Sequence, residues 1–134
     1  MMTPKHIKKK PSEAETAILR VLWDEQPLSV RAIHARLGDA RQVGYTTILK
    51  QVQRMHDKGL VTRTKGEGKS FDYSAAVAEN ATKSRLVDRF VKTAFDGSVP
   101  ELVMHALGND KASPSDIAEI RAFLDQLEAD DNTA

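Results

Sequence analysis

Hydroxyl and cationic side chains recur at helical spacing between residues 46 and 54, a stretch that contains no carboxylate. At 100° per residue, Lys50 and Arg54 share one face of a helix with two threonines. The cations can donate hydrogen bonds to phosphates or guanine edges, and threonine can contact bases through its hydroxyl and methyl groups. We therefore predict a surface that reads the major groove of DNA, with an ordinary solvated helix face as the competing interpretation. The residues assigned to it are Arg41, Tyr45, Thr46, Thr47, Lys50 and Arg54.

A second basic group follows closely along the chain. Arg63, Lys65 and Lys69 flank two glycines in the stretch Lys65-Gly66-Glu67-Gly68-Lys69. Glycine allows close approach of a backbone to its ligand, so a hairpin tip with these cations suits contacts with phosphates or with the minor groove. We add the three cations to the predicted DNA-binding residues.

The other polar residues form no catalytic or metal-binding pattern. The chain has no cysteine, which excludes disulfides, thiolate metal sites and thiol nucleophiles. Gly68-Lys69-Ser70 matches the end of a phosphate-binding loop, but the first glycine of that motif would fall on Arg63. No nucleophile, base and orienting group converge, so we expect neither an enzyme nor a cofactor. The histidines lack the spacing of metal ligands; they are His6, His34, His56 and His105.

Charge is distributed unevenly along the chain. Residues 1–74 hold 14 Lys/Arg and 8 Asp/Glu, a net charge of +6, whereas residues 75–134 hold 6 and 11, a net charge of −5. This asymmetry indicates that the first part meets a polyanion and the second does not, with chance fluctuation as the alternative.

Helix caps and periodicity predict the elements that would position these residues. Ser12 and Glu15 form a capping-box pattern, which begins a helix that should end before Pro27. Ser29 caps a second, short helix, which we expect Gly38-Asp39 to break.

The third helix and the hairpin follow directly. The helix is expected from about Tyr45 to Lys58, with Gly59 as its left-handed stop. Residues 60–64 and 70–73 are β-prone and are joined by the glycine-containing loop. Three helices followed by a hairpin are the order of a winged helix.

The C-terminal part carries more large apolar side chains than three short helices bury alone. We expect one helix over about 79–95, another after the cap at Ser98, and a last one after Ser113-Pro114-Ser115-Asp116, with residues 129–134 frayed. A second copy of the chain is the simplest partner for the remaining apolar surface. The residues assigned to this dimer contact are Val87, Phe90, Val91, Phe95, Leu102, Val103, Ile117, Ile120, Phe123, Leu124 and Leu127.

The predicted fold class is mainly α with a small β-hairpin (α+β). The chain is predicted to divide into a basic flexible tail at 1–11, a winged helix-turn-helix domain at 12–75 and a helical dimerisation domain at 78–128. No apolar segment follows the basic N-terminus, and no run of about 18 apolar residues occurs, so we expect no signal peptide and no membrane span. A cytoplasmic location is the resulting expectation.

Several stretches resemble the penicillinase repressor (BlaI/MecI) family. They are residues 12–23, residues 28–33 and residues 44–61, which include Gly-Tyr-Thr-Thr-Ile and Lys-Gly-Leu-Val. Residues 95–98 and 113–117 are similar to the C-terminal helices of that family, so the resemblance covers nearly the whole chain. It implies a homodimeric winged-helix repressor on an inverted-repeat operator, with dimer contacts from the C-terminal helices.

The resemblance also implies a signal and a target. In the better-known members, a membrane-bound metalloprotease sensor activated by β-lactam leads to a cut at an Asn-Phe bond in a dimerisation helix. The implied partner is therefore a regulatory protease, and the implied target is an operon of the β-lactamase or antibiotic-resistance type. At the matching position this chain reads His105-Ala106, which departs from the family pattern.

The sequence thus predicts a sequence-specific DNA-binding transcriptional repressor that acts as a homodimer. One alternative is a winged helix that binds an acidic protein partner. A mobility-shift assay with genomic fragments would distinguish this alternative from DNA binding. The other is an architectural DNA binder, which its ratio of specific to non-specific affinity would reveal.

Overall fold

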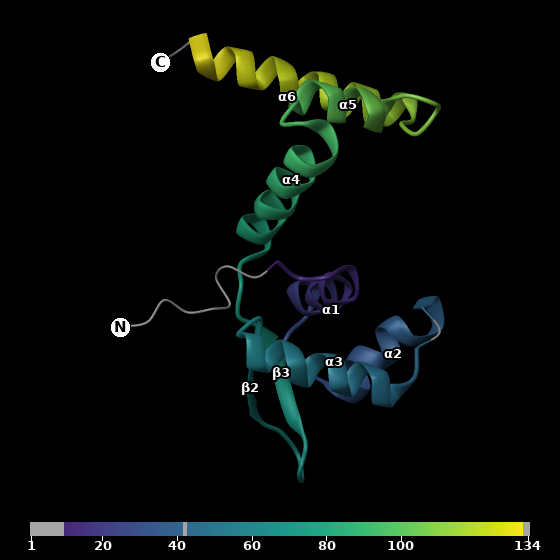
Figure 1. Ribbon diagram of the computed structural model, residues 1–134, viewed down its shortest axis with the longest axis vertical. Helices are drawn as coiled ribbons and strands as arrows, with labels where there is room; N and C mark the ends of the chain where they lie inside the picture. The colour runs from purple at the N-terminus through teal and green to yellow at the C-terminus, as the bar shows by residue number, and fades with distance from the viewer. Residues whose placement is uncertain (1–9, 42, 133–134) are drawn as a thin grey trace. The chain divides into compact units, whose positions relative to one another are not determined.

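The structure, a computed structural model, describes residues 10–41 and 43–132, with the side chains of 39–41 left out. The predicted tail at 1–11 therefore lies mostly outside the described residues. Two compact units divide at Leu86/Val87, within one helix. The elements of Figure 1 are α1 (Glu13–Asp24), β1 (Leu28–Ser29), α2 (Val30–Arg41), α3 (Tyr45–Lys58), β2 (Val61–Lys65), β3 (Phe71–Ala75), α4 (Glu79–Phe95), α5 (Val99–Leu107) and α6 (Pro114–Asn132).

The caps of the first two helices are those that the sequence predicts. The Ser12 hydroxyl accepts a hydrogen bond from the Glu15 N–H (3.1 Å), and the Glu15 carboxylate accepts one from the Ser12 N–H (2.9 Å). α1 ends at Asp24, before Pro27, as expected. The Ser29 hydroxyl accepts from the backbone N–H three residues further on (3.1 Å), which caps α2.

The expected break of α2 at Gly38-Asp39 is wrong, because the helix continues to Arg41. A glycine inside a helix costs about 1 kcal/mol relative to alanine, which packing of the helix can offset. Gly38 also makes room for a neighbour, since a Cβ there would lie 3.0 Å from His34 Nε2. His34 uses that nitrogen to contact the carbonyl oxygen of Val43 at 2.9 Å.

The predicted hairpin is present and belongs to a three-stranded sheet. β2 and β3 pair antiparallel, with Lys65 opposite Phe71. β1 pairs with the other edge of β3, where Leu28 lies opposite Tyr73, so the strand order is β1-β3-β2. β1 has only two residues, too few to show an alternating pattern, and the sequence did not predict it.

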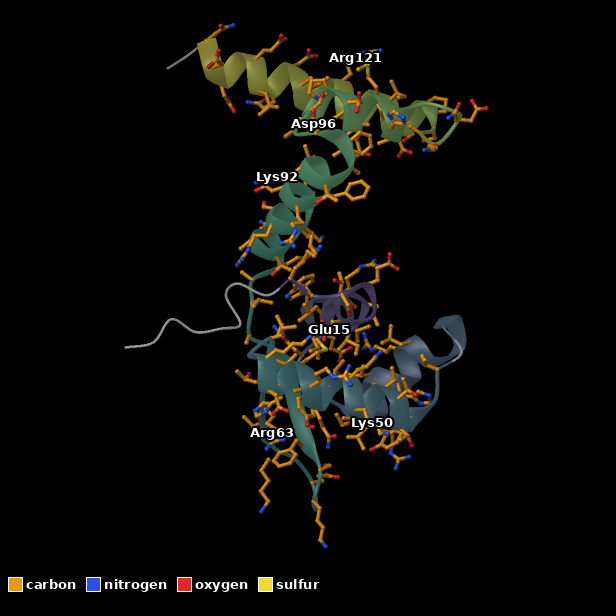
Figure 2. The ribbon with its side chains drawn as sticks, in the orientation of Figure 1. Glu15, Lys50, Arg63, Lys92, Asp96 and Arg121 are labelled. Carbon is orange, nitrogen blue, oxygen red and sulfur yellow. The ribbon has the colours of Figure 1, made fainter. Side chains whose placement is uncertain are left out.

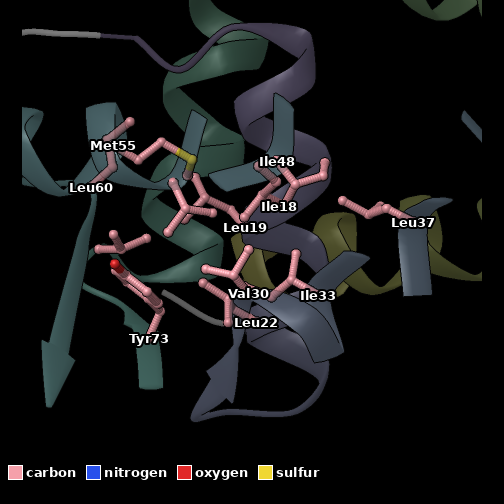
Figure 3. Packing of buried hydrophobic residues seen from close by; sticks show 12 residues of the cluster. Ile18, Leu19, Leu22, Val30, Ile33, Leu37, Ile48, Met55, Leu60 and Tyr73 are labelled. Carbon is pink, nitrogen blue, oxygen red and sulfur yellow. The ribbon is translucent and has the colours of Figure 1, made fainter. Parts of the chain in front are cut away.

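The core of the first unit lies between α1, α2, α3 and the sheet (Figure 3). Each large apolar side chain that is removed from water contributes roughly 1.5–3 kcal/mol. Trp23 packs at the edge of this core, and its indole N–H donates to the Val77 carbonyl oxygen (3.0 Å). The buried residues are Ile18, Leu19, Leu22, Val30, Ile33, Leu37, Ile48, Val52, Met55, Leu60, Val61 and Tyr73.

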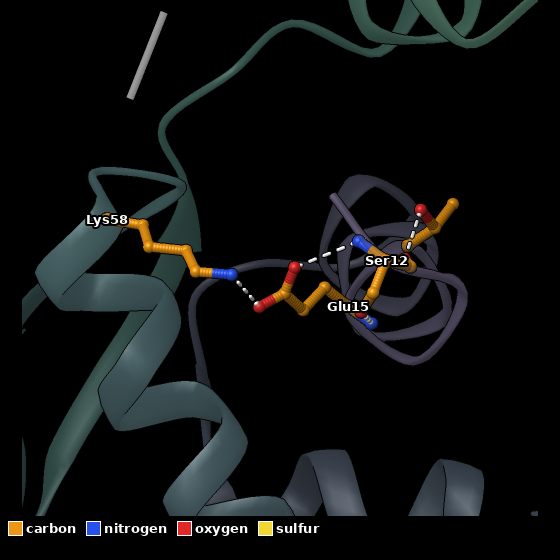
Figure 4. Close-up of polar contacts among 4 residues, drawn as sticks. Ser12, Glu15 and Lys58 are labelled. Carbon is orange, nitrogen blue, oxygen red and sulfur yellow. Dashed lines mark hydrogen bonds and ion pairs between the residues drawn. The ribbon is translucent and has the colours of Figure 1, made fainter. Parts of the chain in front are cut away.

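A nearly buried ion pair joins the start of α1 to the end of α3 (Figure 4). The Lys58 ammonium donates to the second carboxylate oxygen of Glu15 at 2.8 Å. Burial acts to raise the pKa of Glu15, but the hydrogen bonds from Lys58 and Ser12 and the positive charge of Lys58 outweigh it, so this pKa lies below its usual value. Glu15 therefore caps one helix and anchors another.

In the second unit, the helix starts follow the sequence patterns. The Ser98 hydroxyl accepts from the Glu101 N–H (3.2 Å) at the start of α5. Ser113 and Asp116 exchange two hydrogen bonds of 3.0 Å at the start of α6. The expected fraying is wrong for residues 129–132, since α6 continues to Asn132, and residues 133–134 lie outside the described residues. No proline or glycine interrupts this last stretch.

Candidate nucleic-acid interface

The outer face of α3 is open to solvent. Thr46, Thr47, Lys50 and Arg54 are all exposed, and Tyr45 is 43% exposed. The opposite face supplies Ile48, Val52 and Met55 to the core, as expected for an amphipathic helix. The structure thus confirms that the acid-free face is exposed to solvent.

The start of α3 adds backbone donors to this face. Gly44 occupies the N-cap position and has no side chain to cap the first turn. The free N–H groups of a helix N-terminus and its dipole favour a negative charge such as a phosphate. Gly59 at the other end has φ +84°, the left-handed conformation predicted for the helix stop.

The hairpin presents its three predicted cations to solvent. Arg63, Lys65 and Lys69 are exposed, and Lys50 and Arg63 lie on the side of the first unit away from α1 in the view of Figure 2. The tip turns where the Gly66 N–H donates to the Ser70 carbonyl oxygen at 2.9 Å. Gly68 has φ +62°, a conformation that glycine adopts without steric cost.

Arg63 is held in place by an aromatic side chain from the neighbouring strand. Its guanidinium carbon lies 4.1 Å from the centroid of the Phe71 ring, a cation–π geometry. Phe71 remains 37% exposed, so the pair sits at the surface. Phe71 was not among the predicted residues, although the diagonal position of Arg63 and Phe71 on two paired β-prone segments was a usable signal.

A groove of about 730 Å³ runs between α3, the start of α2 and the hairpin. It brings together three predicted DNA-binding residues, namely Tyr45, Arg63 and Lys69. The other predicted side chains of α3 and the hairpin do not line it. Arg41 is the last residue of α2, and its side chain lies outside the described residues.

The groove also contains residues that the sequence analysis missed. Arg31, in the first turn of α2, and Gln53, one turn after Lys50, both line it. The position of Arg31 just after the Ser29 cap was a usable signal, because helix starts near the duplex contact phosphates. The Glu67 carboxylate lies on the same groove and reduces its positive charge.

The predicted dimer residues lie in the second unit, and most are accessible. Phe95, Leu102, Ile117 and Ile120 are half-buried. Val91 is only 5% exposed, so it packs within its own chain and does not form part of an open surface, which corrects its assignment. Met104, which was not assigned, is 65% exposed. The exposed assigned residues are Val87, Phe90, Val103, Phe123, Leu124 and Leu127.

The described part of the chain contains neither a membrane-spanning helix nor a cluster of metal-binding side chains. None of the helices within residues 10–41 and 43–132 combines the length and the hydropathy of a membrane-spanning segment. In the same ranges, no group of three or more His, Cys, Asp or Glu side chains could hold a metal ion.

Comparison with known proteins places this site in a family. The model of the penicillinase repressor family matches residues 11–126. The chain is 25% identical to the methicillin resistance regulatory protein MecI of Mammaliicoccus sciuri over 115 residues, which cover 86% of this chain and 93% of that protein. It is also 25% identical to the penicillinase repressor of Bacillus licheniformis, with 86% and 89% covered.

A solved structure supports the fold. The PcaV transcriptional regulator of Streptomyces coelicolor is similar with a TM-score of 0.51 at 18% identity, over 92% of this chain and 77% of that one. The family match extends from the first helix cap into α6 and includes the whole candidate interface. The chain belongs to the penicillinase repressor family, whose members are DNA-binding transcriptional repressors and not enzymes.

Proposed function

We propose that this repressor acts as a homodimer on an inverted-repeat DNA operator, with one α3 helix of each protomer in the major groove. The observation that carries the proposal is the exposed face of α3, which holds cations and hydroxyls without a carboxylate between residues 46 and 54. A groove-reading helix needs such a face, because base edges are recognised by donors, acceptors and methyl groups.

The two halves of the surface have different proposed roles. Thr46, Thr47, Lys50 and Arg54 point outward from α3 and are the proposed base readers. The cations of the hairpin and Arg31 are the proposed phosphate contacts, which set register and add affinity on any sequence. Arg63 needs little ordering on binding, because Phe71 already supports its guanidinium.

The proposed dimer contact uses the apolar side chains that the second unit leaves in water. Phe90 is 55% exposed, Phe123 is 61% exposed and Leu124 is 52% exposed. Monomeric proteins rarely leave groups of such residues uncovered, so a second copy is the proposed cover. Two identical chains would then present two α3 helices to two half-sites of opposite direction.

Salt dependence tests the phosphate contacts directly. If each protomer neutralises about four phosphates, the slope of log K against log salt should be near −7 for the dimer. A fluorescence anisotropy titration over a range of salt concentrations measures this slope, and a value shallower than about −2 would contradict the proposal. Lys92→Ala, which removes an exposed cation of α4, is the control and should leave the slope unchanged.

Substitutions separate base reading from phosphate contact. The operator is first selected from fragments of the native genome, and a random duplex serves as the reference. Lys69→Ala should weaken binding to both duplexes by the same factor. Thr47→Ala or Lys50→Ala should instead reduce the ratio of the operator affinity to the random-duplex affinity. Equal losses on both duplexes for all three variants would mean that α3 does not read bases. This result would favour the architectural alternative, and no DNA binding at all would favour the protein-binding module.

The regulated genes are proposed from the named relatives. These relatives are regulators of methicillin resistance and penicillinase, so we propose an operon of the antibiotic-resistance type, in the cytoplasm where its DNA lies. Sequencing of the selected genomic fragments tests this directly. Fragments next to genes without any link to β-lactams would contradict it.

Cleavage by a regulatory protease at His105-Ala106 stays a prediction. The bond lies inside α5, where His105 Nδ1 contacts the Glu101 carbonyl oxygen at 3.2 Å. The Gly108 N–H donates to the Met104 carbonyl oxygen at 3.0 Å in the same helix. A protease would reach this peptide bond only after local unfolding of α5, so cutting should be slow unless a signal opens the helix.

A further inference from the structure

A cavity of about 650 Å³ lies in the first unit between α1, α2 and the first turns of α4. It shares no lining residue with the groove beside α3. Its volume falls within the range of roughly 300–1,000 Å³ that is typical of small-molecule sites. None of the proposed DNA-contacting residues lines this cavity.

One wall of the cavity is apolar and is anchored by Trp23. The Trp23 indole N–H already donates to the Val77 carbonyl oxygen (3.0 Å), so the ring offers only apolar contact to an occupant. Ala17, Val21 and Leu37 line the cavity with it. Such a wall suits an aromatic ring or a compact hydrocarbon.

The charged residues that line the cavity differ in whether they have an ion-pair partner. Asp24 pairs with Arg36 at 3.4 Å, and Glu79 accepts a hydrogen bond from Lys83 at 2.6 Å. Arg36 also pairs with Glu25 through its other terminal nitrogen, so two carboxylates share this one guanidinium. Arg20 also lines the cavity, and its guanidinium has no hydrogen bond or ion pair within the part of the chain that the structure describes. Among the lining cations, Arg20 is therefore the one without a carboxylate partner in the described residues, and it lies beside an apolar wall.

We propose that this cavity binds a small organic anion with an aromatic or compact apolar body. Its carboxylate pairs with Arg20, and its ring packs against Trp23. A guanidinium and a carboxylate can form two parallel hydrogen bonds, which orient the ligand as well as hold it. A cationic ligand is disfavoured, because Arg20 would repel it and both lining carboxylates already pair with cations of the chain.

The chain contains its own reporter for this site, because Trp23 is its single tryptophan. The full-length protein, without DNA, is titrated with benzoate, cyclohexanecarboxylate and 2-naphthoate while Trp23 fluorescence is followed, and calorimetry gives an independent Kd. Benzyl alcohol and benzylammonium serve as the neutral and cationic probes. At least one carboxylate should bind saturably with a Kd of about 1 mM or tighter, and tenfold or more tightly than the alcohol.

A pair of variants ties the binding to Arg20. Arg20→Gln removes the unmatched charge and should weaken carboxylate binding about tenfold or more. Arg85→Gln removes the same charge from an exposed position of α4 that does not line the cavity, and its affinity should equal that of the wild type. Circular dichroism shows whether both variants keep their helix content.

The site is overturned if none of the three carboxylates changes Trp23 emission saturably, or if Arg20→Gln binds them as the wild type does. Equal affinity for benzoate and benzyl alcohol would also overturn it, since charge would then play no part. Operator binding by the wild type is measured in parallel. If the wild type binds DNA but binds none of the three carboxylates, the cavity inference fails and the proposed function stands.

Discussion

Replacement of Lys58 by methionine tests how strongly the ion pair with Glu15 holds α3 in place. The Glu15 residue is only 4% exposed, and its carboxylate accepts hydrogen bonds from Lys58 (2.8 Å) and from the Ser12 N–H (2.9 Å). Lys58→Met keeps most of the apolar stem and leaves one carboxylate oxygen without its donor. A hydrogen bond to a charged group contributes about 1.5–3 kcal/mol to stability.

Two features of the site set the expected value within this range. The Lys58 side chain is 27% exposed, so water can partly replace the lost ammonium, which favours the lower end. Lys58 also lies in the last turn of α3, where a cation adds about 0.3–1 kcal/mol through the helix dipole. We expect Lys58→Met to lower the free energy of unfolding by about 2 kcal/mol. In urea, with a slope of about 1 kcal/mol/M, the midpoint should fall by roughly 2 M.

Urea titrations followed by Trp23 fluorescence measure this loss, because Trp23 packs against the core of the first unit. The control is Lys83→Met, which breaks the pair with Glu79, in which the side chains are 55% and 47% exposed. An exposed pair at this spacing contributes about 0.5 kcal/mol or less. Equal losses in the two variants would refute the importance of burial at Glu15.

The pH dependence provides a second check on the same pair. The folded pKa of Glu15 lies below its usual value of 4.5, so its contribution is fully present above pH 4.5 and is lost as the pH falls through the folded pKa. The stability gap between the wild type and Lys58→Met should therefore narrow as the solution becomes more acidic than pH 4.5. A gap of the same size at pH 7 and at pH 3 would show that the Glu15 charge is not involved.

Three further predictions concern the helix stop, the hairpin and the second unit. Gly59→Ala should destabilise the first unit by roughly 1–2 kcal/mol in urea titrations, because φ is +84° at this position; no loss would mean that the turn relaxes freely. Phe71→Ala should weaken DNA binding about two- to fivefold in anisotropy titrations by releasing Arg63, and this effect should vanish in the Arg63→Ala background. Leu124→Asp should convert the proposed dimer to monomer in sedimentation velocity experiments at micromolar concentration, and a wild type that is already monomeric would contradict that assembly.

The sequence predicts the helices well where a local signal marks their ends. The capping box at Ser12, the left-handed Gly59 and the cap at Ser113 each work through hydrogen bonds or backbone conformations within a few residues. The exposed face of α3 is equally accessible to prediction, because the period of 3.6 residues separates its apolar and polar positions. For these features, the chain within one helix contains all the information that is needed.

The features that sequence reasoning missed depend on contacts between distant segments. Glu15 and Lys58 stand 43 residues apart, and nothing in either neighbourhood indicates the other. The continuation of α2 through Gly38 depends on the position of His34, which the glycine alone does not reveal. Val91 shares the apolar periodicity of its exposed neighbours, yet it is buried. Periodicity identifies which apolar side chains are to be buried, but it does not identify the segment or the partner chain that buries them.

Apolar and polar contacts have different effects on the position of α3: apolar packing stabilises it, and hydrogen bonds fix its orientation. Apolar packing supplies most of the free energy but is not directional, so it permits a helix to rotate slightly in its groove. Hydrogen bonds depend on angle as well as distance. Lys58 is tied to Glu15 at one end of α3 (2.8 Å), and His34 contacts both the Val43 carbonyl oxygen (2.9 Å) and the Tyr45 ring (centroids 6.2 Å apart) at the other. Because the helix is held at both ends, its outer face keeps the direction that the proposed base reading requires.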